Sequence, residues 1–147
     1  MYRKILVATD GSTLSKKAVR SAIELAGSLS AEIVALYVVP RYPVSYFEGG
    51  VTVSSQEVAR IERQWADKGQ AVVDAVRQSA EAQGIRARGV VSRSDLVAES
   101  ILATAKKHKC DLVVMASHGR KGLKRILLGS ETQHVLTGST VPVLVLR

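Results

Sequence analysis

The apolar residues change their spacing along the chain in a regular order, and this order predicts the secondary structure. Residues 4–9 (KILVAT) and 32–39 (EIVALYVV) are short, nearly continuous apolar runs, as expected of strands covered on both faces. Residues 10–30 lie between them, carry Ser12 and Thr13 near their start, and place apolar residues three or four positions apart. This spacing predicts a helix that starts at a capping hydroxyl.

The rest of the chain continues the alternation. Ile61, Trp65, Val72 and Val76 keep a helical period, which predicts a long amphipathic helix over 55–83 that ends at Gly84. Residues 41–54, with two tyrosines, a proline and paired glycines, are interpreted as an irregular excursion or lid. The remaining predicted elements are a strand at 85–92, a helix at 96–108, a strand at 111–116, a helix from 130 to about 137, and a strand at 141–146.

Strands that alternate with helices predict the fold class. Parallel neighbours need long right-handed crossovers, so five strands and four helices indicate a doubly wound α/β fold with helices on both faces of a five-stranded parallel sheet. We expect residues 1–147 to form a single domain. Ligands of such sheets bind beyond the carboxyl ends of the strands. The candidate loops are therefore 9–12, 38–40 and the segment from Ser117 onward.

Composition and charge restrict the possible functions. The longest apolar run, 33–39, is much shorter than the ~20 residues of a membrane span, and no secretory signal is visible. With the single cysteine, Cys110, expected to be a quiet semi-buried thiol, this favours a cytoplasmic protein. The net charge of +8 favours anionic partners. Aromatic residues make up only 4% of the chain, which argues against stacking on single-stranded nucleic acid.

The loop after the fourth strand is the strongest candidate for chemistry. Neither GxGxxG nor GxxxxGK[S/T] occurs, but Gly119 is followed after nine residues by Gly129 and Ser130, which open a helix. A phosphate needs converging N–H groups, close approach and a helix N-terminus, and residues 129–132 can supply that end, with the hydroxyls of Ser130 and Thr132 as further donors. Basic residues at 120, 121, 124 and 125 would add a positive field.

Each part of this loop also has a purely structural explanation. Ser130 is a good N-cap, and Glu131 in a first helical turn suits the helix dipole without any ligand. Asp10, after the first strand, is a good turn and capping residue as well as a candidate contact for ribose or metal. His118 either touches phosphate or stabilises the turn.

Four segments resemble the universal stress protein family over the whole chain. They are KILVATDGS, LYVV, CDLVVMASHGRKGLKRILLGSETQHVL and VPVLVLR. The resemblance implies an adenine nucleotide alpha hydrolase-like fold with strand order 3-2-1-4-5. ATP-binding members carry a pattern Gly-x-x-Gly, nine residues, Gly-Ser/Thr; here it reads Ala116-x-x-Gly119, nine residues, Gly129-Ser130.

The resemblance also implies a ligand and the residues that hold it. ATP is the expected ligand, with AMP as the alternative, accompanied by Mg²⁺. Ala8, Thr9 and Asp10 would face the adenosine, Val38 and Met115 the adenine, and Gly119, Gly129, Ser130 and Thr132 the phosphates, with Ala116, Ser117 and Glu131 completing the site. The last strand, Val141 to Arg147, would form a homodimer.

Two departures from the family pattern bear on this expectation. Ala116 stands where the first motif glycine is expected; it would be costly in a left-handed backbone but compatible with a strand end. Residues 93–100 (RSDLVAES) replace a glycine-proline turn, which is expected to alter a loop outside the phosphate contacts.

The sequence shows no catalytic group and no metal-ligand spacing. His108, near a helix C-terminus, is expected to be a surface residue compatible with the helix dipole, and His134 is expected to be structural. Neither a Ser-His-Asp arrangement nor a paired set of carboxylates can be assembled. The leading hypothesis is a nucleotide-binding homodimer that serves in a stress response and is at most a slow ATPase. The alternatives are a dimeric interaction module of the same fold with an empty cradle and, with less support, a nucleic-acid-binding protein.

Overall fold

The computed structural model describes residues 1–43, 54–119 and 128–147. Most of the predicted excursion and the four basic residues between positions 120 and 125 lie outside these ranges. The elements are β1 (Lys4–Ala8), α1 (Thr13–Leu29), β2 (Glu32–Val39), α2 (Ser55–Glu81), β3 (Ala87–Arg93), α3 (Val97–Lys107), β4 (Leu112–Ala116), α4 (Ser130–Gly138) and β5 (Val143–Leu146). The order of strands and helices is the one that the periodicity predicts.

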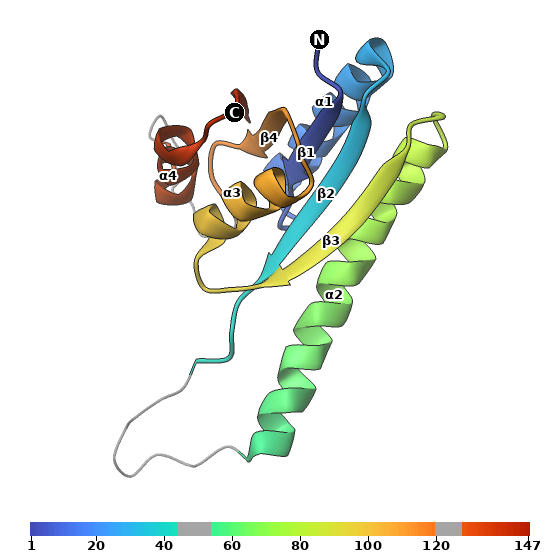
Figure 1. Cartoon of the computed structure of the whole chain (residues 1–147). Helices are drawn as coiled ribbons and strands as arrows, with labels where there is room; N and C mark the ends of the chain where they lie inside the picture. Colours follow the sequence, from blue (N-terminus) through green and yellow to red (C-terminus); the bar gives the residue numbers. More distant parts are fainter. Residues whose placement is uncertain (44–53, 120–127) are drawn as a thin grey trace.

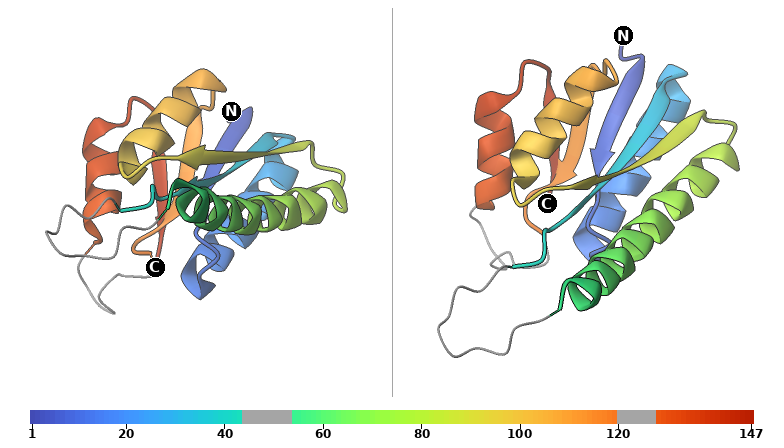
Figure 2. Two further views of the ribbon diagram at one scale, coloured as in Figure 1. Left: turned by 90° about the horizontal axis from the view of Figure 1, so that it is seen from below. Right: turned by 60° about the horizontal axis from the view of Figure 1, so that its bottom comes forward.

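The five strands form one parallel sheet in the order β3-β2-β1-β4-β5, which confirms the expected fold class and strand order (Figure 1). Helices cover both faces of the sheet, as Figure 2 shows from two further directions. One core lies beneath α1 and α2 and includes Ile5, Val7 and Val114; the other lies beneath α3 and α4 and includes Leu6 and Val113. Alternate residues of the central strands thus enter opposite cores, which explains their continuous apolar runs.

Two strands start two residues later than predicted, for local reasons. Before β3, Ile85 is still part of the helix end, because its N–H donates to the Ala80 carbonyl and Gly84 adopts a left-handed φ of 76°. At β5, Pro142 carries no N–H, although its carbonyl accepts from Val113 across the edge of the sheet. Regular pairing of β5 with β4 therefore begins at Val143.

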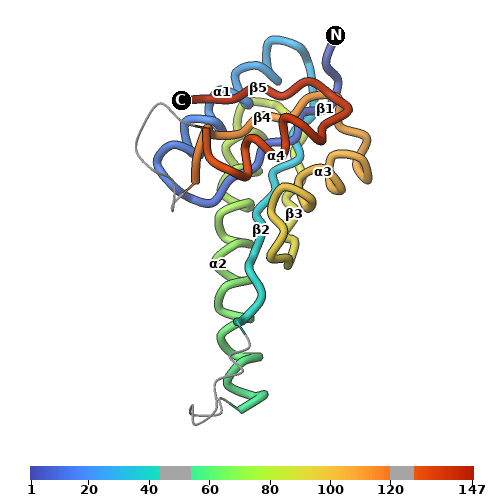
Figure 3. The backbone as a smooth tube through the Cα atoms, turned by 90° about the vertical axis from the view of Figure 1, so that its left-hand side faces the viewer, coloured from blue at the N-terminus to red at the C-terminus, as the bar shows by residue number. Residues whose placement is uncertain are grey.

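The long helix α2 lies along β2 and β3, and its first turns run past the carboxyl end of β2 (Figure 3). Its buried residues, Gly69, Val73, Val76 and Ala80, all belong to its later half. A Cβ at Gly69 would stand 2.7 Å from the Tyr37 ring, so this glycine allows the helix to approach the sheet closely.

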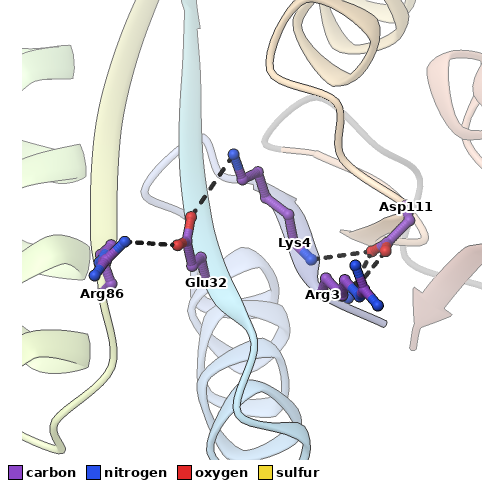
Figure 4. A network of polar contacts seen from close by, with 5 residues as sticks. All are labelled: Arg3, Lys4, Glu32, Arg86 and Asp111. Carbon is purple, nitrogen blue, oxygen red and sulfur yellow. Dashed lines mark hydrogen bonds and ion pairs between the residues drawn. The ribbon is translucent and has the colours of Figure 1, made fainter. Parts of the chain in front are cut away.

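At the amino-terminal edge of the sheet, polar groups satisfy one another (Figure 4). The Asp111 carboxylate accepts hydrogen bonds from the backbone N–H groups of Arg3 and Lys4 at 2.9–3.1 Å. Glu32 pairs with the Lys4 ammonium at 3.7 Å and with the Arg86 guanidinium at 3.1 Å. These contacts join the beginnings of β1, β2, β3 and β4. Within the described ranges, no helix is both long and apolar enough for a membrane crossing.

Candidate functional site

A cleft of about 1020 Å³ lies at the carboxyl ends of the central strands. The right-hand view of Figure 2 brings this edge forward. The structure brings together in its lining all of the predicted site residues except Ser117: Ala8, Thr9, Asp10, Val38, Met115, Ala116, Gly119, Gly129, Ser130, Glu131 and Thr132. The cleft is located at the topological switch point of the sheet, between β1 and β4, where ligands of doubly wound folds typically bind.

The turn after β1 is built around Asp10. Its Oδ1 accepts the Ser12 N–H at 2.9 Å, and Gly11 adopts a left-handed φ of 78° that other residues rarely take. Ser12 then caps α1 by accepting from the Ser15 N–H. The predicted turn role of Asp10 is therefore confirmed, whereas the cap of α1 is Ser12; the turn role is compatible with a ligand contact because Asp10 also lines the cleft.

The hydroxyl of Thr9 is used inside the protein. The Ser15 hydroxyl donates to the Ser12 carbonyl, so it accepts from the Thr9 hydroxyl at 3.0 Å, and Thr9 in turn accepts the Gly11 N–H. Thr9 therefore shapes the floor of the cleft, and its one hydroxyl proton is not available to a ligand.

Gly119 lies against the Asp10 carboxylate. A Cβ at position 119 would be only 2.8 Å from Asp10 Oδ2, so any other residue there would displace the Asp10 carboxylate from its present position. Gly129 plays a comparable part, since a Cβ there would meet the Ser117 carbonyl oxygen at 3.2 Å and the His118 Cα at 3.4 Å. The two motif glycines thus have a packing reason that holds even without a ligand.

Ser117 lies outside the cleft lining but fixes the position of α4. Its carbonyl accepts from the Gly129 N–H at 2.8 Å and from the Thr132 hydroxyl at 3.0 Å, and its N–H donates to Leu146. Thr132 is 2% exposed, and its hydroxyl also lies 3.1 Å from the Ala116 carbonyl. This differs from the expectation that Thr132 offers its hydroxyl to phosphate: the single proton is directed at main-chain carbonyls, which leaves the backbone N–H as its free donor.

The N-terminus of α4 faces the cleft without a side-chain cap. The N-cap residue is Gly129, not Ser130, and Ser130 is the exposed first residue of the helix. Within the described chain, the N–H groups of Ser130, Glu131 and Thr132 make no hydrogen bond to a protein group; the first amide to do so is that of Gln133. Three N–H donors and the positive end of the helix dipole are thus directed at one place.

Ala116 lies in regular strand geometry. It is the last residue of β4, pairs with Leu146 and is 8% exposed. Left-handed φ angles of non-glycine residues occur, within the described part, only at Ser30 and Lys109. Alanine at the first motif position therefore carries no backbone strain and adds only a methyl group to the wall of the cleft.

Further residues line the cleft that the motifs did not indicate. Trp65 and Lys68 reach it from α2, and Ser94 and Asp95 from the loop after β3. Trp65 stacks on Tyr42 with ring centroids 6.1 Å apart, and Asp95 accepts the Arg41 N–H. In the sequence, Trp65 is one more residue of an apolar helix face, so only the tertiary arrangement reveals its position.

Cys110 is 5% exposed, which suits the predicted quiet thiol, and His108 is the C-cap residue of α3. Burial raises the pKa of the Cys110 thiol to about 11, with Lys4 lowering and Asp111 raising it by smaller amounts. Burial, and then the neighbouring charges of Arg88, Lys107 and Lys4, lower the pKa of His108. In residues 1–43, 54–119 and 128–147, no three His, Cys, Asp or Glu side chains gather as metal ligands. His118 lines the cleft, with Nδ1 3.2 Å from the Ser117 hydroxyl.

Comparisons with known proteins agree with this geometry. The profile of the Universal stress protein family matches residues 1–147. The universal stress protein MJ0531 of Methanocaldococcus jannaschii is 37% identical over 147 residues, which cover 100% of this chain and 83% of the relative. The structure of UspA from Lactobacillus plantarum superposes with a TM-score of 0.83 at 23% identity, covering 99% of this chain and 98% of the other.

Two structural relatives were solved with adenine nucleotides. One is a universal stress protein in complex with cAMP, with a TM-score of 0.67 and 25% identity, covering 99% of this chain and 97% of the other. The second, from Archaeoglobus fulgidus, is in complex with dAMP, with a TM-score of 0.65 and 18% identity, covering 99% and 98% of the two chains. The second likeness concerns the fold alone.

Proposed function

The chain belongs to the universal stress protein family, and on this basis we propose that it binds an adenine nucleotide, with ATP as the preferred ligand, in the cleft at the carboxyl edge of the sheet. Its role is regulatory, within a stress response, and depends on the nucleotide-bound state. The relative solved with cAMP supports the class of ligand.

One observation carries this proposal: the uncapped N-terminus of α4. Within the described ranges, the N–H groups of residues 130–132 donate to no protein group, and Gly129 leaves the approach free of a side chain. Unpaired N–H groups at a helix start are satisfied by water or by an anion, and phosphate is the anion that such ends typically bind. We therefore assign the phosphates to this end of the cleft.

The remaining walls suit a nucleoside. Met115 is 6% exposed and Val38 is half-buried, and both line the cleft with apolar surface of the kind that a purine ring contacts. Asp10 lies beside Gly119 in the lining of the same cleft, and its carboxylate is a suitable hydrogen-bond acceptor for the ribose that connects base and phosphates. Mg²⁺ would enter with the phosphates, because the described residues form no ready-made metal site.

The same groups support binding rather than rapid hydrolysis. The site supplies N–H donors and apolar contacts, while the carboxylates of Asp10 and Glu131 in its lining already accept the backbone N–H groups of Ser12 and Ala98. We expect any ATPase activity to be slow. AMP would occupy the same site with fewer phosphate contacts, so we expect it to bind more weakly than ATP.

The proposal is tested by titrating nucleotide-free protein with ATP and Mg²⁺ in a calorimeter, using Ser130→Glu and Ser130→Gln variants. Ser130 is exposed at the first helical position, where glutamate is well tolerated, so both variants should fold. Glutamate places a negative charge beside the phosphates and should weaken ATP binding about tenfold, roughly 1.4 kcal/mol. Glutamine has the same size without the charge and should change affinity less than about threefold.

Two results would contradict the proposal. Wild-type protein that gives neither heat nor thermal stabilisation at millimolar ATP would exclude nucleotide binding. Equal affinities of Ser130→Glu and wild type would show that the phosphates lie elsewhere.

We also propose that the chain forms a homodimer through its last strand, Val141 to Arg147. β5 is at the end of the sheet, and because the carbonyls of Pro142 and Leu146 point toward β4, those of Val143 and Val145 point outward. Leu144 is 40% exposed beside this unpaired edge. Edge strands of this kind are stabilised by pairing or by cover.

The dimer is tested by Leu144→Lys, with Leu136→Lys as the matched control. Leu136 on α4 is 41% exposed, almost as much as Leu144, but lies off the strand. Light scattering after gel filtration should give a dimer mass for wild type and for Leu136→Lys. Leu144→Lys should shift toward the monomer mass. A wild-type monomer, or a dimer that both variants retain, would overturn this interface.

A further inference from the structure

The side chain of Glu131 makes a contact that the motif does not explain. Glu131 is in the first turn of α4, yet its Oε2 accepts the backbone N–H of Ala98, in the first turn of α3, at 3.0 Å. The two residues are 33 positions apart, and the bond is partly buried. An acidic residue at this place would ordinarily interact with the start of its own helix. Here it serves a neighbouring one.

The start of α3 needs this partner. Its N-cap residue is Leu96, which has no side-chain oxygen and makes no side-chain cap. The Leu96 N–H is satisfied locally by the Ser94 hydroxyl at 3.0 Å, and Ser100 is the first amide to bond within the helix. The Glu131 carboxylate is therefore the group that caps α3, and it neutralises the positive end of that helix.

The start of α4 is left open by the same contact. The Glu131 carboxylate is engaged by Ala98, while the N–H groups of Ser130, Glu131 and Thr132 have no partner in the described chain. A carboxylate turned toward these N–H groups would compete with a phosphate for them, because both are anions that use the same donors.

We propose that Glu131 is a positioning residue that keeps the phosphate-binding end of α4 free by placing its own carboxylate on the N-terminus of α3. The contact also joins two walls of the cleft, since Asp95 and Val97, which shortly precede Ala98 in the chain, line it together with Gly129 and Ser130. The effect of Glu131 on phosphate binding rests on the proposed function, whereas its contact with Ala98 can be tested without any ligand.

Three substitutions separate the reach of the side chain from its charge. Glu131→Gln keeps an acceptor oxygen at the same distance and removes the charge. Glu131→Asp keeps the charge but is one methylene shorter, so its carboxylate cannot reach Ala98 and returns to the start of α4. Glu131→Ala removes both. Glu99→Gln is the matched control, because Glu99 is an exposed acid in the first turn of α3 and does not line the cleft.

The first measurement is amide hydrogen exchange of Ala98 in nucleotide-free, isotope-labelled protein. The Ala98 amide should exchange about fivefold faster in Glu131→Ala and Glu131→Asp than in wild type, and Glu131→Gln should restore most of the protection. Equal exchange in wild type and Glu131→Ala would overturn the cap.

The second measurement is the affinity for ATP with Mg²⁺. Glu131→Gln should bind as well as wild type or better, Glu131→Ala about threefold more weakly, and Glu131→Asp about tenfold more weakly, although its charge equals that of wild type. Glu99→Gln should leave the affinity unchanged. Wild-type affinity in Glu131→Asp would overturn the positioning role. Wild-type protein that binds no ATP would overturn the proposed function, while Ala98 exchange would still decide whether Glu131 caps α3.

Discussion

At the amino-terminal edge of the sheet, the N–H groups of Arg3 and Lys4 donate to the Asp111 carboxylate, whereas at the carboxyl edge the N–H groups that begin α4 have no protein partner within the described chain. Both edges thus present backbone N–H donors. At the amino-terminal edge, the chain itself supplies the anion that accepts from them, the Asp111 carboxylate. A carboxylate is also close to the second edge, at Glu131, but it is bound to another helix. The difference agrees with the proposed function, in which the first edge contributes stability and the second binds the phosphates of a ligand.

The largest effect on stability is expected when the acceptor at the amino-terminal edge of the sheet is removed. Asp111→Ala leaves the N–H groups of Arg3 and Lys4 without their acceptor, which should cost about 2 kcal/mol of unfolding free energy. Thermal unfolding should occur about 5–8 °C lower. Because the cleft is at the opposite edge, the affinity of folded protein for ATP should be unchanged.

Asp111→Asn is the control for this prediction. It keeps one acceptor oxygen and should lose about half as much stability as the alanine variant. Denaturant unfolding measures the stability, and calorimetry the affinity. A loss of ATP affinity in Asp111→Ala under conditions where the protein is folded would show that the two edges are coupled.

A smaller effect is expected when a methyl group is added at the carboxyl edge of the sheet, which we call the open edge because the N–H groups that begin α4 have no partner in the described chain. Gly119→Ala places a Cβ 2.8 Å from Asp10 Oδ2, so the carboxylate has to move although its other oxygen holds the Ser12 N–H. We expect ATP affinity to fall about fivefold, close to 1 kcal/mol, with a stability loss of similar size or less. Calorimetric titration and thermal unfolding of the same sample measure both quantities.

Gly27→Ala is the matched substitution away from the cleft. A Cβ at Gly27 would meet Ile85 at an ordinary 3.7 Å within α1, so stability should rise by about 0.5–1 kcal/mol and ATP affinity should stay constant. If Gly119→Ala bound ATP as well as Gly27→Ala does, the contact between Gly119 and Asp10 would have no part in the site.

The sequence predicts where the open edge lies, but it does not predict the hydrogen bonds that the side chains make there. Apolar spacing predicts the strands and helices, and the spacing of Gly119, Gly129 and Ser130 locates the loop and the helix start that the structure places at the cleft. Local pattern does not reveal that Thr132 turns its hydroxyl to Ala116 or that Glu131 reaches Ala98, because both partners come from other elements. Such contacts depend on how the helices dock.

The same limit explains what was missed in the cleft. The apolar period of α2 is explained by packing on the sheet, and Trp65 and Lys68 reach the site only because this helix lies along β2, whose carboxyl end borders the cleft. The N-cap of α4 illustrates a different limit. Serine is the better capping residue in general, but Gly129 takes the position because the space between it and Ser117 excludes a side chain without a shift.

The smallest expected effect concerns Ala116, where the family pattern has glycine. Ala116 is in regular strand geometry and its carbonyl accepts from Thr132, so nothing in its backbone requires glycine. Ala116→Gly should lose about 0.5–1 kcal/mol of stability, because glycine in a strand has more freedom to lose on folding. ATP affinity should change by less than about twofold, since only one methyl group is removed from the wall of the cleft.

Ala35→Gly, in the buried part of β2 and outside the cleft lining, is the control; it should lose at least as much stability and leave the affinity for ATP unchanged. Denaturant unfolding and ATP titration of the two variants side by side decide the matter. An affinity gain of fivefold or more, confined to Ala116→Gly, would mean that the methyl group obstructs the ligand and that the open edge is partly closed in this chain.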